Sequence, residues 1–256
     1  MDLKSKLISG ERPLLGSFLG LPSPPLVEML GHAGYDFVVL DAEHGTFSPE
    51  RMEESVRAAD AVGIPCVVRV ADLEAKLILS ALDLGAEGVQ VPQVETAEQA
   101  RAVVRFSHFP PVGDRGYGST TRAARYGFRP RPEVRETALQ RRVVSIQIES
   151  KPGVEHLQAI LGTDGIDVVF IGTSDLSLSY GYDSPNDPAM MPLLEKLIST
   201  IHSAGKIPGL HLSDWSKIET LHRMGVRYFT VSTPAVIRDA FVSQVKDFSL
   251  RVKRDS

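Results

Sequence analysis

Polar residues capable of chemistry follow several short apolar runs of this chain. These residues are Asp41, His44, Arg69, Gln147, Glu149, the segment Gly172–Asp175 and His211. If the runs are strands of one parallel barrel, their carboxyl ends meet at one mouth, where barrel enzymes carry their active sites. Carboxylates, imidazoles and a guanidinium brought together there would form a candidate active site.

Glu149 and Asp175 could share one metal ion. Two carboxylates, with water and substrate oxygens completing the shell, are how Mg²⁺ is usually bound. The sequence contains no dense group of histidines and cysteines, so zinc is not expected. The alternative is that each carboxylate pairs with an arginine or caps a helix.

Arg69 and His44 are the other two reactive candidates. Arg69 ends the apolar run Pro65–Arg69, where a guanidinium could bind a carboxylate or an enolate oxygen through two bonds. A structural salt bridge at the barrel rim is the alternative. His44 could act as a general base oriented by Asp41, because an imidazole titrates near neutrality. The alternative is a loop histidine without a catalytic role, and His211 is a strand-end residue with no assigned role.

Covalent chemistry at lysine or cysteine is not favoured. A Schiff base requires a desolvated lysine at the mouth, and none of the apolar runs ends in lysine. Lys206 precedes its run, and Lys151, two residues after Glu149, is the nearest approach. Cys66 lies among apolar neighbours and is expected to be an inert core residue.

The elements that must position these residues are eight short, continuous apolar runs. Runs of this kind are typical of strands that are buried on both faces of a parallel sheet. They are Leu14–Leu19, Phe37–Leu40, Cys66–Val70, Gly88–Val91, Val143–Ile148, Val168–Ile171, Ile207–His211 and Tyr228–Val231.

Helical patterns separate the runs. A helix is predicted over Pro49–Val62 after the cap Ser48, and others over Leu73–Leu84, Ala97–Phe106 and Asp214–Met224. Eight strand–helix units in 256 residues predict an α/β fold, a single (β/α)₈ TIM barrel over residues 1–256. An open doubly wound sheet is the competitor, but no glycine-rich phosphate loop follows the first run.

Composition excludes several classes of protein. With 43% hydrophobic residues and a net charge of −4, the chain is neither disordered nor a general polyanion binder, so no nucleic-acid partner is expected. No apolar run approaches the roughly 18 residues of a membrane span. No apolar segment follows Met1–Lys6, as a signal peptide would require, and there is one cysteine. We therefore expect a cytoplasmic protein without membrane contact.

The segment from residue 109 to residue 132 breaks the alternation. It is rich in proline and glycine and carries five arginines against one acid. Long irregular loops are often functional. It is either a solvated surface excursion or a lid or anion clamp beside the active site, and a nucleic-acid patch is less favoured by the overall charge.

Together, these motifs resemble the HpcH/HpaI aldolase family, the metal-dependent class II pyruvate aldolases, which include 4-hydroxy-2-oxoheptanedioate and 2-dehydro-3-deoxyglucarate aldolases. The similarity extends from about Pro13 to the C-terminal helix. The matching motifs are Asp41-Ala42-Glu43-His44, Arg69, Val91-Pro92-Gln93-Val94-Glu95, Gly113-Asp114-Arg115-Gly116-Tyr117-Gly118, Tyr126-Gly127, Gln147-Ile148-Glu149 and Gly172-Thr173-Ser174-Asp175-Leu176-Ser177.

The resemblance implies a role for each matched residue. Glu149 and Asp175 would bind Mg²⁺, Mn²⁺ or Co²⁺, and Arg69 would hold the keto oxygen and stabilise the enolate. The remaining implied roles are proton transfer by His44 with Asp41, keto-acid contact by Gln147, and carboxylate binding by the backbone amides of Ser174 and Asp175. Asp83 would reach the site of a neighbouring subunit. The family forms hexamers with exchanged C-terminal helices, so a homohexamer is expected.

The implied activity is reversible cleavage of a 4-hydroxy-2-keto acid to pyruvate and an aldehyde. The substrate would be a 2-keto-3-deoxy sugar acid or a 4-hydroxy-2-oxo diacid. Two departures bear on specificity: Thr173-Ser174 replaces the family's frequent Pro-Ala, and Val231-Ser232-Thr233 lacks an acidic residue. The alternatives are a citramalyl- or malyl-CoA lyase, whose chains are usually longer than one ending at Ser256, and a catalytically silent assembly or regulatory barrel.

Overall fold

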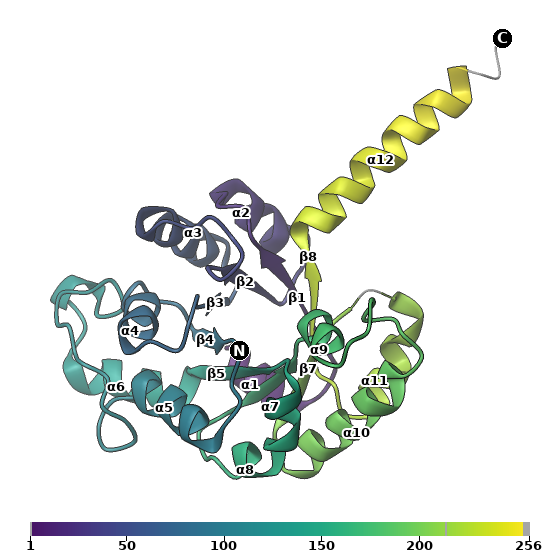
Figure 1. Cartoon of the computed structure of the whole chain (residues 1–256). Coiled ribbons are helices and arrows are strands. Elements are labelled where there is room, and N and C mark those ends of the chain that lie inside the picture. The colour runs from purple at the N-terminus through teal and green to yellow at the C-terminus, as the bar shows by residue number, and fades with distance from the viewer. Residues whose placement is uncertain (1, 213, 253–256) are drawn as a thin grey trace.

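In the computed structural model, which describes residues 2–212 and 214–252, eight parallel strands close into a barrel in the order of the chain (Figure 1). The strands are β1(Leu14–Leu19), β2(Phe37–Asp41), β3(Cys66–Arg69), β4(Gly88–Val91), β5(Val143–Ile148), β6(Val168–Ile171), β7(Ile207–His211) and β8(Tyr228–Ser232). Pairing of β1 with β8, in which Gly16 lies opposite Thr230, completes the ring. The TIM barrel predicted from the sequence is confirmed.

Helices surround this barrel, and one of them leaves it (Figure 1). They are α1(Leu3–Ser9), α2(Pro24–His32), α3(Pro49–Val62), α4(Ala75–Asp83), α5(Ala97–Ser107), α6(Arg131–Arg141), α7(Lys151–Glu155), α8(Leu157–Leu161), α9(Thr173–Ser179), α10(Met190–Ser203), α11(Ile218–Arg223) and α12(Thr233–Val252), with 3-10 turns η1(Arg125–Gly127) and η2(Trp215–Lys217). α12 projects away from the barrel, and Thr233 is its one buried residue within the described part of the helix.

Local signals explain the helix boundaries. The Ser48 hydroxyl accepts a hydrogen bond from the Arg51 amide, and α3 spans the predicted residues. α4 begins at Ala75, two residues later than predicted, because the Asp72 carboxylate accepts from the Leu73 amide and holds that turn outside the helix. The helix predicted over Asp214–Met224 divides into η2 and α11.

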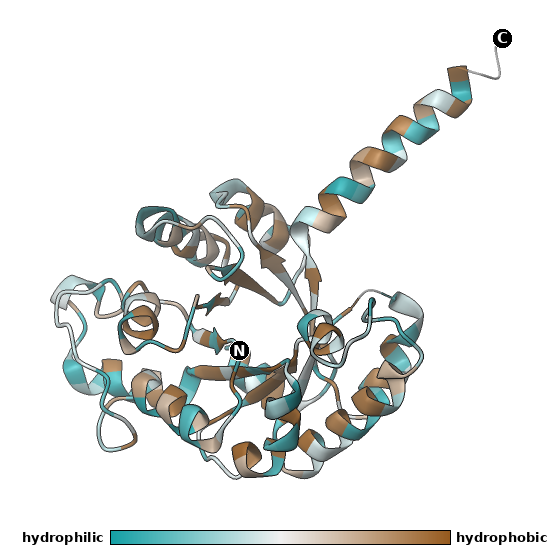
Figure 2. Ribbon diagram, viewed as in Figure 1, coloured by the Kyte–Doolittle hydropathy of each residue, from teal (hydrophilic) through white to brown (hydrophobic). Residues whose placement is uncertain are grey.

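The amino-terminal end of the barrel is closed by aromatic side chains. The rings of Phe37 and Tyr228 lie 4.3 Å apart and Phe170 packs edge-on against Tyr228, while Leu3 and Leu7 of α1 join the same apolar cluster. Figure 2 shows the strands as predominantly hydrophobic. Because this end is apolar and filled, the barrel interior opens to solvent at the carboxyl ends of its strands.

The irregular segment after α5 folds over a small core of its own. Phe109, Ala124, Val134 and Ala138 form this cluster, and Tyr117 packs against it. The segment contains η1 and ends where α6 begins at Arg131, slightly earlier than predicted. None of the helices in the described ranges combines the length and the apolar character needed to cross a bilayer.

Candidate functional site

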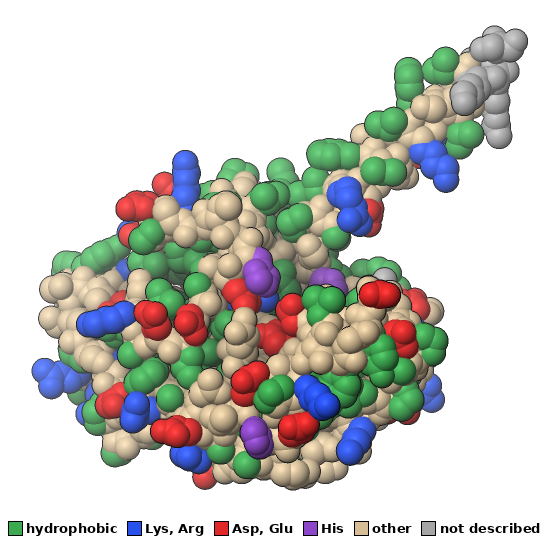
Figure 3. Space-filling model, viewed as in Figure 1, with side chains coloured by type: hydrophobic (Ala, Val, Ile, Leu, Met, Phe, Trp, Pro, Cys, Tyr) green, Lys and Arg blue, Asp and Glu red, His purple; other side chains and the backbone are tan. Residues whose placement is uncertain are grey.

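A cavity of about 370 Å³ opens at the carboxyl ends of the strands. All the predicted site residues except Asp83 line it, namely Asp41, His44, Arg69, Gln147, Glu149, Ser174 and Asp175, and His211 lines it as well. Acidic and histidine side chains gather in the middle of the face shown in Figure 3. Residues from distant parts of the sequence therefore meet at one mouth.

Arg69 is held rigidly at the cavity wall. Its Nε and Nη2 donate to the two oxygens of Asp41 at 2.8 and 2.6 Å, and Nη1 lies 2.9 Å from Oε2 of Glu43. The guanidinium also packs 4.8 Å from the centre of the Phe18 ring. Arg69 therefore fits both interpretations from the sequence: it makes a salt bridge at the rim, and it also lines the cavity, where it could bind substrate.

Glu43 is a site residue to which the sequence assigned no role. Its side chain is 9% exposed, and its Oε2 lies 3.9 Å from Nε2 of His44, whose side chain is 64% exposed. Asp41 accepts from the backbone amides of Glu43 and His44. Glu43 is therefore the carboxylate beside the His44 ring, whereas Asp41 binds the His44 backbone. Burial raises the pKa of Glu43, and the Arg69 charge opposes that shift.

Glu149 is held by β5 and by the loop that follows β4, and it packs against a glycine. Its Oε1 accepts from the Gln93 amide at 2.8 Å, and its Oε2 accepts from Nε2 of Gln147 at 2.5 Å. A Cβ on Gly172 would lie 2.3 Å from Oε2, so only glycine leaves room for this carboxylate. Burial raises the pKa of Glu149, and the charges of Glu43 and Asp175 raise it further.

Gln147 is in turn oriented from below by Gln90, a second residue that the sequence did not single out. The Gln90 Nε2 donates to Oε1 of Gln147 at 2.7 Å, and its Oε1 accepts from the Ser145 hydroxyl at 3.3 Å. All three side chains are buried. An ionised carboxylate only accepts hydrogen bonds, so Glu149 sets the donor and acceptor direction of every hydrogen bond in the series from Ser145 through Gln90 and Gln147.

The charge of the cavity is unbalanced toward negative. Among the described residues, Asp41, Glu149 and Asp175 line the cavity and Glu43 adjoins it through Arg69, so four carboxylates accompany one guanidinium. No set of three or more His, Cys, Asp or Glu side chains within the described ranges is arranged to hold a metal. A cation bound by Glu149 and Asp175 would need oxygens from water or substrate, and such an all-oxygen shell suits Mg²⁺ rather than Zn²⁺.

Other predicted residues lie outside this cavity. Asp83 accepts from Nη2 of Arg115 at 2.6 Å, and Arg122 pairs with Asp60. Neither arginine lines the cavity, so the loop does not clamp an anion in the site of its own chain. Cys66 is a buried core residue, as expected, and burial raises the pKa of its thiol.

His211 lines the cavity from the end of β7. Burial lowers the pKa of its imidazole, which favours the neutral form at neutral pH. No lysine is among the residues that line the cavity within the described part of the chain. The arrangement thus favours acid–base and electrostatic chemistry over a lysine Schiff base.

Known proteins share this architecture and much of this sequence. The chain is 36% identical over 236 residues to a 2-keto-3-deoxy-L-rhamnonate aldolase of Klebsiella pneumoniae, covering 91% of this chain and 87% of the relative. It is 35% identical to a hydroxypyruvate/pyruvate aldolase of Roseobacter denitrificans, covering 90% and 89%. A crystal structure of a Burkholderia cenocepacia family protein superposes with a TM-score of 0.87 at 32% identity and covers 98% of both chains.

The model of the family described as HpcH/HpaI aldolase/citrate lyase matches residues 14–230. This match spans all eight strands up to the middle of β8. It confirms the resemblance inferred from the motifs and, with the aldolase relatives, the expected carbon–carbon lyase class. This chain therefore belongs to the HpcH/HpaI aldolase/citrate lyase family.

Proposed function

We propose that this protein is a divalent-metal-dependent pyruvate aldolase that cleaves a 2-keto-3-deoxy sugar acid to pyruvate and a hydroxyaldehyde. The observation that carries the proposal is the cavity in which Arg69 and the carboxylates of Glu149 and Asp175 face one another. The names of both aldolase relatives support a keto-acid substrate. A 4-hydroxy-2-oxo diacid is the second candidate, because the sequence allows either class.

The donor set fits a divalent cation. Glu149 and Asp175 would hold it, with substrate oxygens completing the shell, and Gly172 leaves the space that the Glu149 carboxylate occupies. Burial raises the pKa of Glu149, and the charges of Glu43 and Asp175 raise it further, so a cation in this cavity would stabilise the ionised carboxylates. A cation there supplies Lewis-acid polarisation of the keto oxygen.

The chain's own residues then carry the remaining steps. The Ser174 and Asp175 amides lie in the first turn of α9, where backbone N–H groups lack helical partners, and would bind the substrate carboxylate. His44 would take the proton of the C4 hydroxyl as the C3–C4 bond breaks and the aldehyde carbonyl forms. The bonding electrons move into the pyruvate enolate, which Arg69 stabilises because its guanidinium is already in position.

Arg69 does not need to reorganise for this role. Asp41 and Glu43 occupy its donors on one side, while Phe18 supports its plane. The proton that His44 took from the C4 hydroxyl would then return to C3 of the enolate, which completes pyruvate and leaves His44 neutral again. Gln147, which donates one amide hydrogen to Glu149, keeps a second hydrogen that would contact the keto acid.

Pyruvate release tests the proposal directly. The purified protein is assayed with a panel of 2-keto-3-deoxy acids and 4-hydroxy-2-oxo diacids, with and without chelator. We expect release that stops with chelator and returns with Mg²⁺, Mn²⁺ or Co²⁺. Activity that survives chelator and is abolished by borohydride trapping would overturn the metal assignment. Turnover of acyl-CoA esters alone, or no metal binding, would favour the lyase and silent-barrel alternatives.

We also propose that a second copy of the chain covers α12, in a hexamer with exchanged C-terminal helices. Large apolar side chains of α12 are left exposed, among them Phe241 at 65% and Phe248 at 69%. Asp83 would then lie near a neighbouring site. Light scattering tests this: we expect six times the 27.9 kDa chain mass, lowered by the double substitution Phe241→Glu/Phe248→Glu. A monomeric wild-type protein would refute it.

A further inference from the structure

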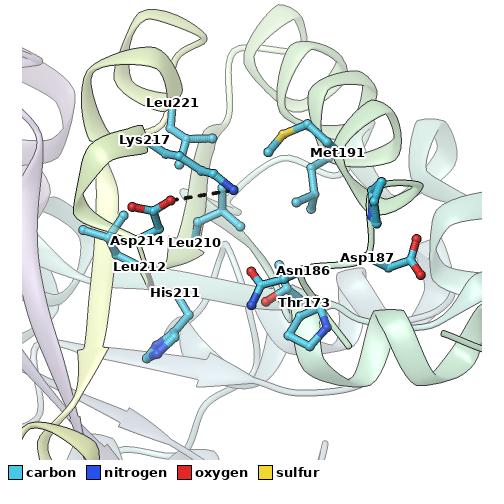
Figure 4. Close-up of a pocket in the computed structure, with 13 residues that line it drawn as sticks. Thr173, Asn186, Asp187, Met191, Leu210, His211, Leu212, Asp214, Lys217 and Leu221 are labelled. Carbon is cyan, nitrogen blue, oxygen red and sulfur yellow. Dashed lines mark ion pairs between the residues drawn. The ribbon is translucent and has the colours of Figure 1, made fainter. Parts of the chain in front are cut away.

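A second cavity, of about 220 Å³, opens beside the active cavity. It lies between the loop that follows α9, the first turns of α10, the end of β7 and η2, as Figure 4 shows. Thr173 and His211 line both cavities. In Figure 4 the His211 ring points away from this second cavity, and the two cavities adjoin at these shared residues.

The second cavity combines an apolar side with a polar edge. Met191 of α10, Leu210 of β7 and Leu221 of α11 supply the apolar side. Asn186 and Thr173 supply polar groups to its lining (Figure 4). The volume equals that of about seven water molecules, which is room for a short hydroxylated chain with an alkyl end.

The charges around this cavity oppose a second carboxylate. Asp187, Asp214 and Lys217 line it, which leaves one excess negative charge. Hydrogen bonds from the Ser216 hydroxyl and amide lower the pKa of Asp214, so it stays ionised at neutral pH. Lys217 is already near Asp214, with Nζ 3.9 Å from Oδ2. The arginines that could have balanced an acidic substrate, Arg115 and Arg122, pair elsewhere.

We propose that this second cavity receives the aldehyde half of the substrate and selects neutral hydroxyaldehydes with an apolar end over carboxylate-ended aldehydes. The inference rests on the proposed aldolase function and chooses between its two substrate classes. Asn186 and Thr173 would meet hydroxyl groups, and Met191, Leu210 and Leu221 would meet the alkyl end. The keto acid would lie in the active cavity, and the C3–C4 bond would pass beside Thr173 and His211, which line both cavities.

A charge-neutralisation experiment tests the selection. Initial rates of aldol addition of pyruvate are measured with lactaldehyde and with succinic semialdehyde, using the wild-type protein and the variant Asp187→Asn/Asp214→Asn. Each asparagine keeps a side-chain oxygen for the backbone bonds now made to Ala189 and Ser216, so the loops stay folded. Asp164→Asn, at an exposed carboxylate outside both cavities, is the matched control.

We expect the wild-type protein to prefer lactaldehyde. Removing the two negative charges that line the cavity should raise kcat/KM for succinic semialdehyde relative to lactaldehyde by at least about tenfold. Asp164→Asn should leave the ratio unchanged. A wild-type preference for succinic semialdehyde, or a ratio that the double variant does not change, would overturn the inference.

A partial reaction separates this inference from the proposed function. Exchange of the pyruvate methyl protons in D₂O requires enolisation in the active cavity and no aldehyde. Met191→Trp, which fills the second cavity, should lower kcat/KM for lactaldehyde while this exchange persists. If the wild-type protein fails to exchange these protons, the proposed function fails. If exchange occurs but Met191→Trp leaves lactaldehyde kinetics unchanged, the assignment of the second cavity alone fails.

Discussion

Replacing Gly172 with alanine should displace the Glu149 carboxylate. The backbone of Gly172 has φ −77° and ψ 83°, a conformation without the positive φ that would itself disfavour alanine. The added Cβ would lie 2.3 Å from Oε2 of Glu149 and 2.7 Å from its Cβ. The second contact is next to the Glu149 backbone, so rotation of the side chain alone cannot relieve the clash.

The size of the effect follows from these distances. An ordinary van der Waals separation requires the carboxylate oxygen to move by about 1 Å. Metal–oxygen distances tolerate about 0.2 Å, so the displaced oxygen can no longer bind a cation in the original geometry. Perturbation of metal-site partners typically weakens binding 10- to 100-fold, or about 1.4–2.8 kcal/mol. Crowding in a packed interior should also cost about 1–3 kcal/mol of folding free energy.

Two measurements check this expectation. Mn²⁺ affinity is determined by electron paramagnetic resonance titration, and the melting temperature is followed without metal. Gly162→Ala is the matched control, because its added Cβ would meet the nearest atom, the Ala159 carbonyl oxygen, at 3.5 Å. A Gly172→Ala protein that binds Mn²⁺ as tightly as the wild type would refute both the role of Glu149 as a ligand and the reasoning from close approach.

Three further substitutions have defined expectations. Arg69→Lys keeps the charge but loses the two-bond contact with Asp41 (2.8 and 2.6 Å), so kcat for pyruvate release should fall about 10²- to 10³-fold while circular dichroism is unchanged; wild-type kcat would show that the guanidinium is dispensable. Gln90→Met removes the side-chain N–H group that donates to Gln147, so the folding free energy should fall by about 1–3 kcal/mol and Mn²⁺ affinity about tenfold. A loss of stability with unchanged Mn²⁺ affinity would show that these hydrogen bonds are only structural. Burial lowers the pKa of His108 from 6.5 to about 4, so its neutral form stabilises the fold above pH 6.5 and this contribution is lost as the pH falls toward 4. His108→Phe should therefore show a smaller drop in melting temperature between pH 6.5 and 4, and an unchanged pH profile would contradict this.

The strands were the most predictable part of the fold. β1, β4, β5, β6 and β7 span the residues predicted for them, because strands buried on both faces are written as unbroken apolar runs. The other three differ by one residue at one end: β2 and β8 extend to Asp41 and Ser232, which line the cavity, and β3 ends before the core residue Val70. Helix ends were less predictable, since a local carboxylate such as Asp72 can satisfy backbone amides outside the helix.

The candidate site was predictable as a set but not as a network. Strand-end position placed His44, Arg69, Glu149 and Asp175 at one mouth. Partner choice depends on side-chain directions across neighbouring strands, which a linear pattern does not contain. Asp41 and Arg69 are opposite each other in the β2–β3 register, and this register explains why Asp41 binds the guanidinium.

Glu43 and Gln90 show two ways in which a functional residue escapes sequence reasoning. Glu43 lies within the quoted Asp-Ala-Glu-His motif, but its proximity to Arg69 emerges only when the loop folds back over β3. Gln90 occupies a position inside a strand, where a polar side chain gives no sign of its partner. Each residue contacts a group that is remote in sequence. A sequence motif could therefore have pointed to Glu43 or Gln90, but it could not have identified the residues that they contact.

The sequence by itself determined the barrel, its family and the residue types available for chemistry. Apolar runs, helix caps and the order of motifs are local properties, so they can be recognised in the sequence without any knowledge of distances. Only the tertiary structure decided that Glu149 is held by Gln147 and packs against Gly172, that Arg115 and Arg122 pair away from the cavity, and that a second cavity adjoins the first. Electrostatic and steric interactions fall off over a few ångströms, so these outcomes depend on closed-barrel geometry that no single segment encodes.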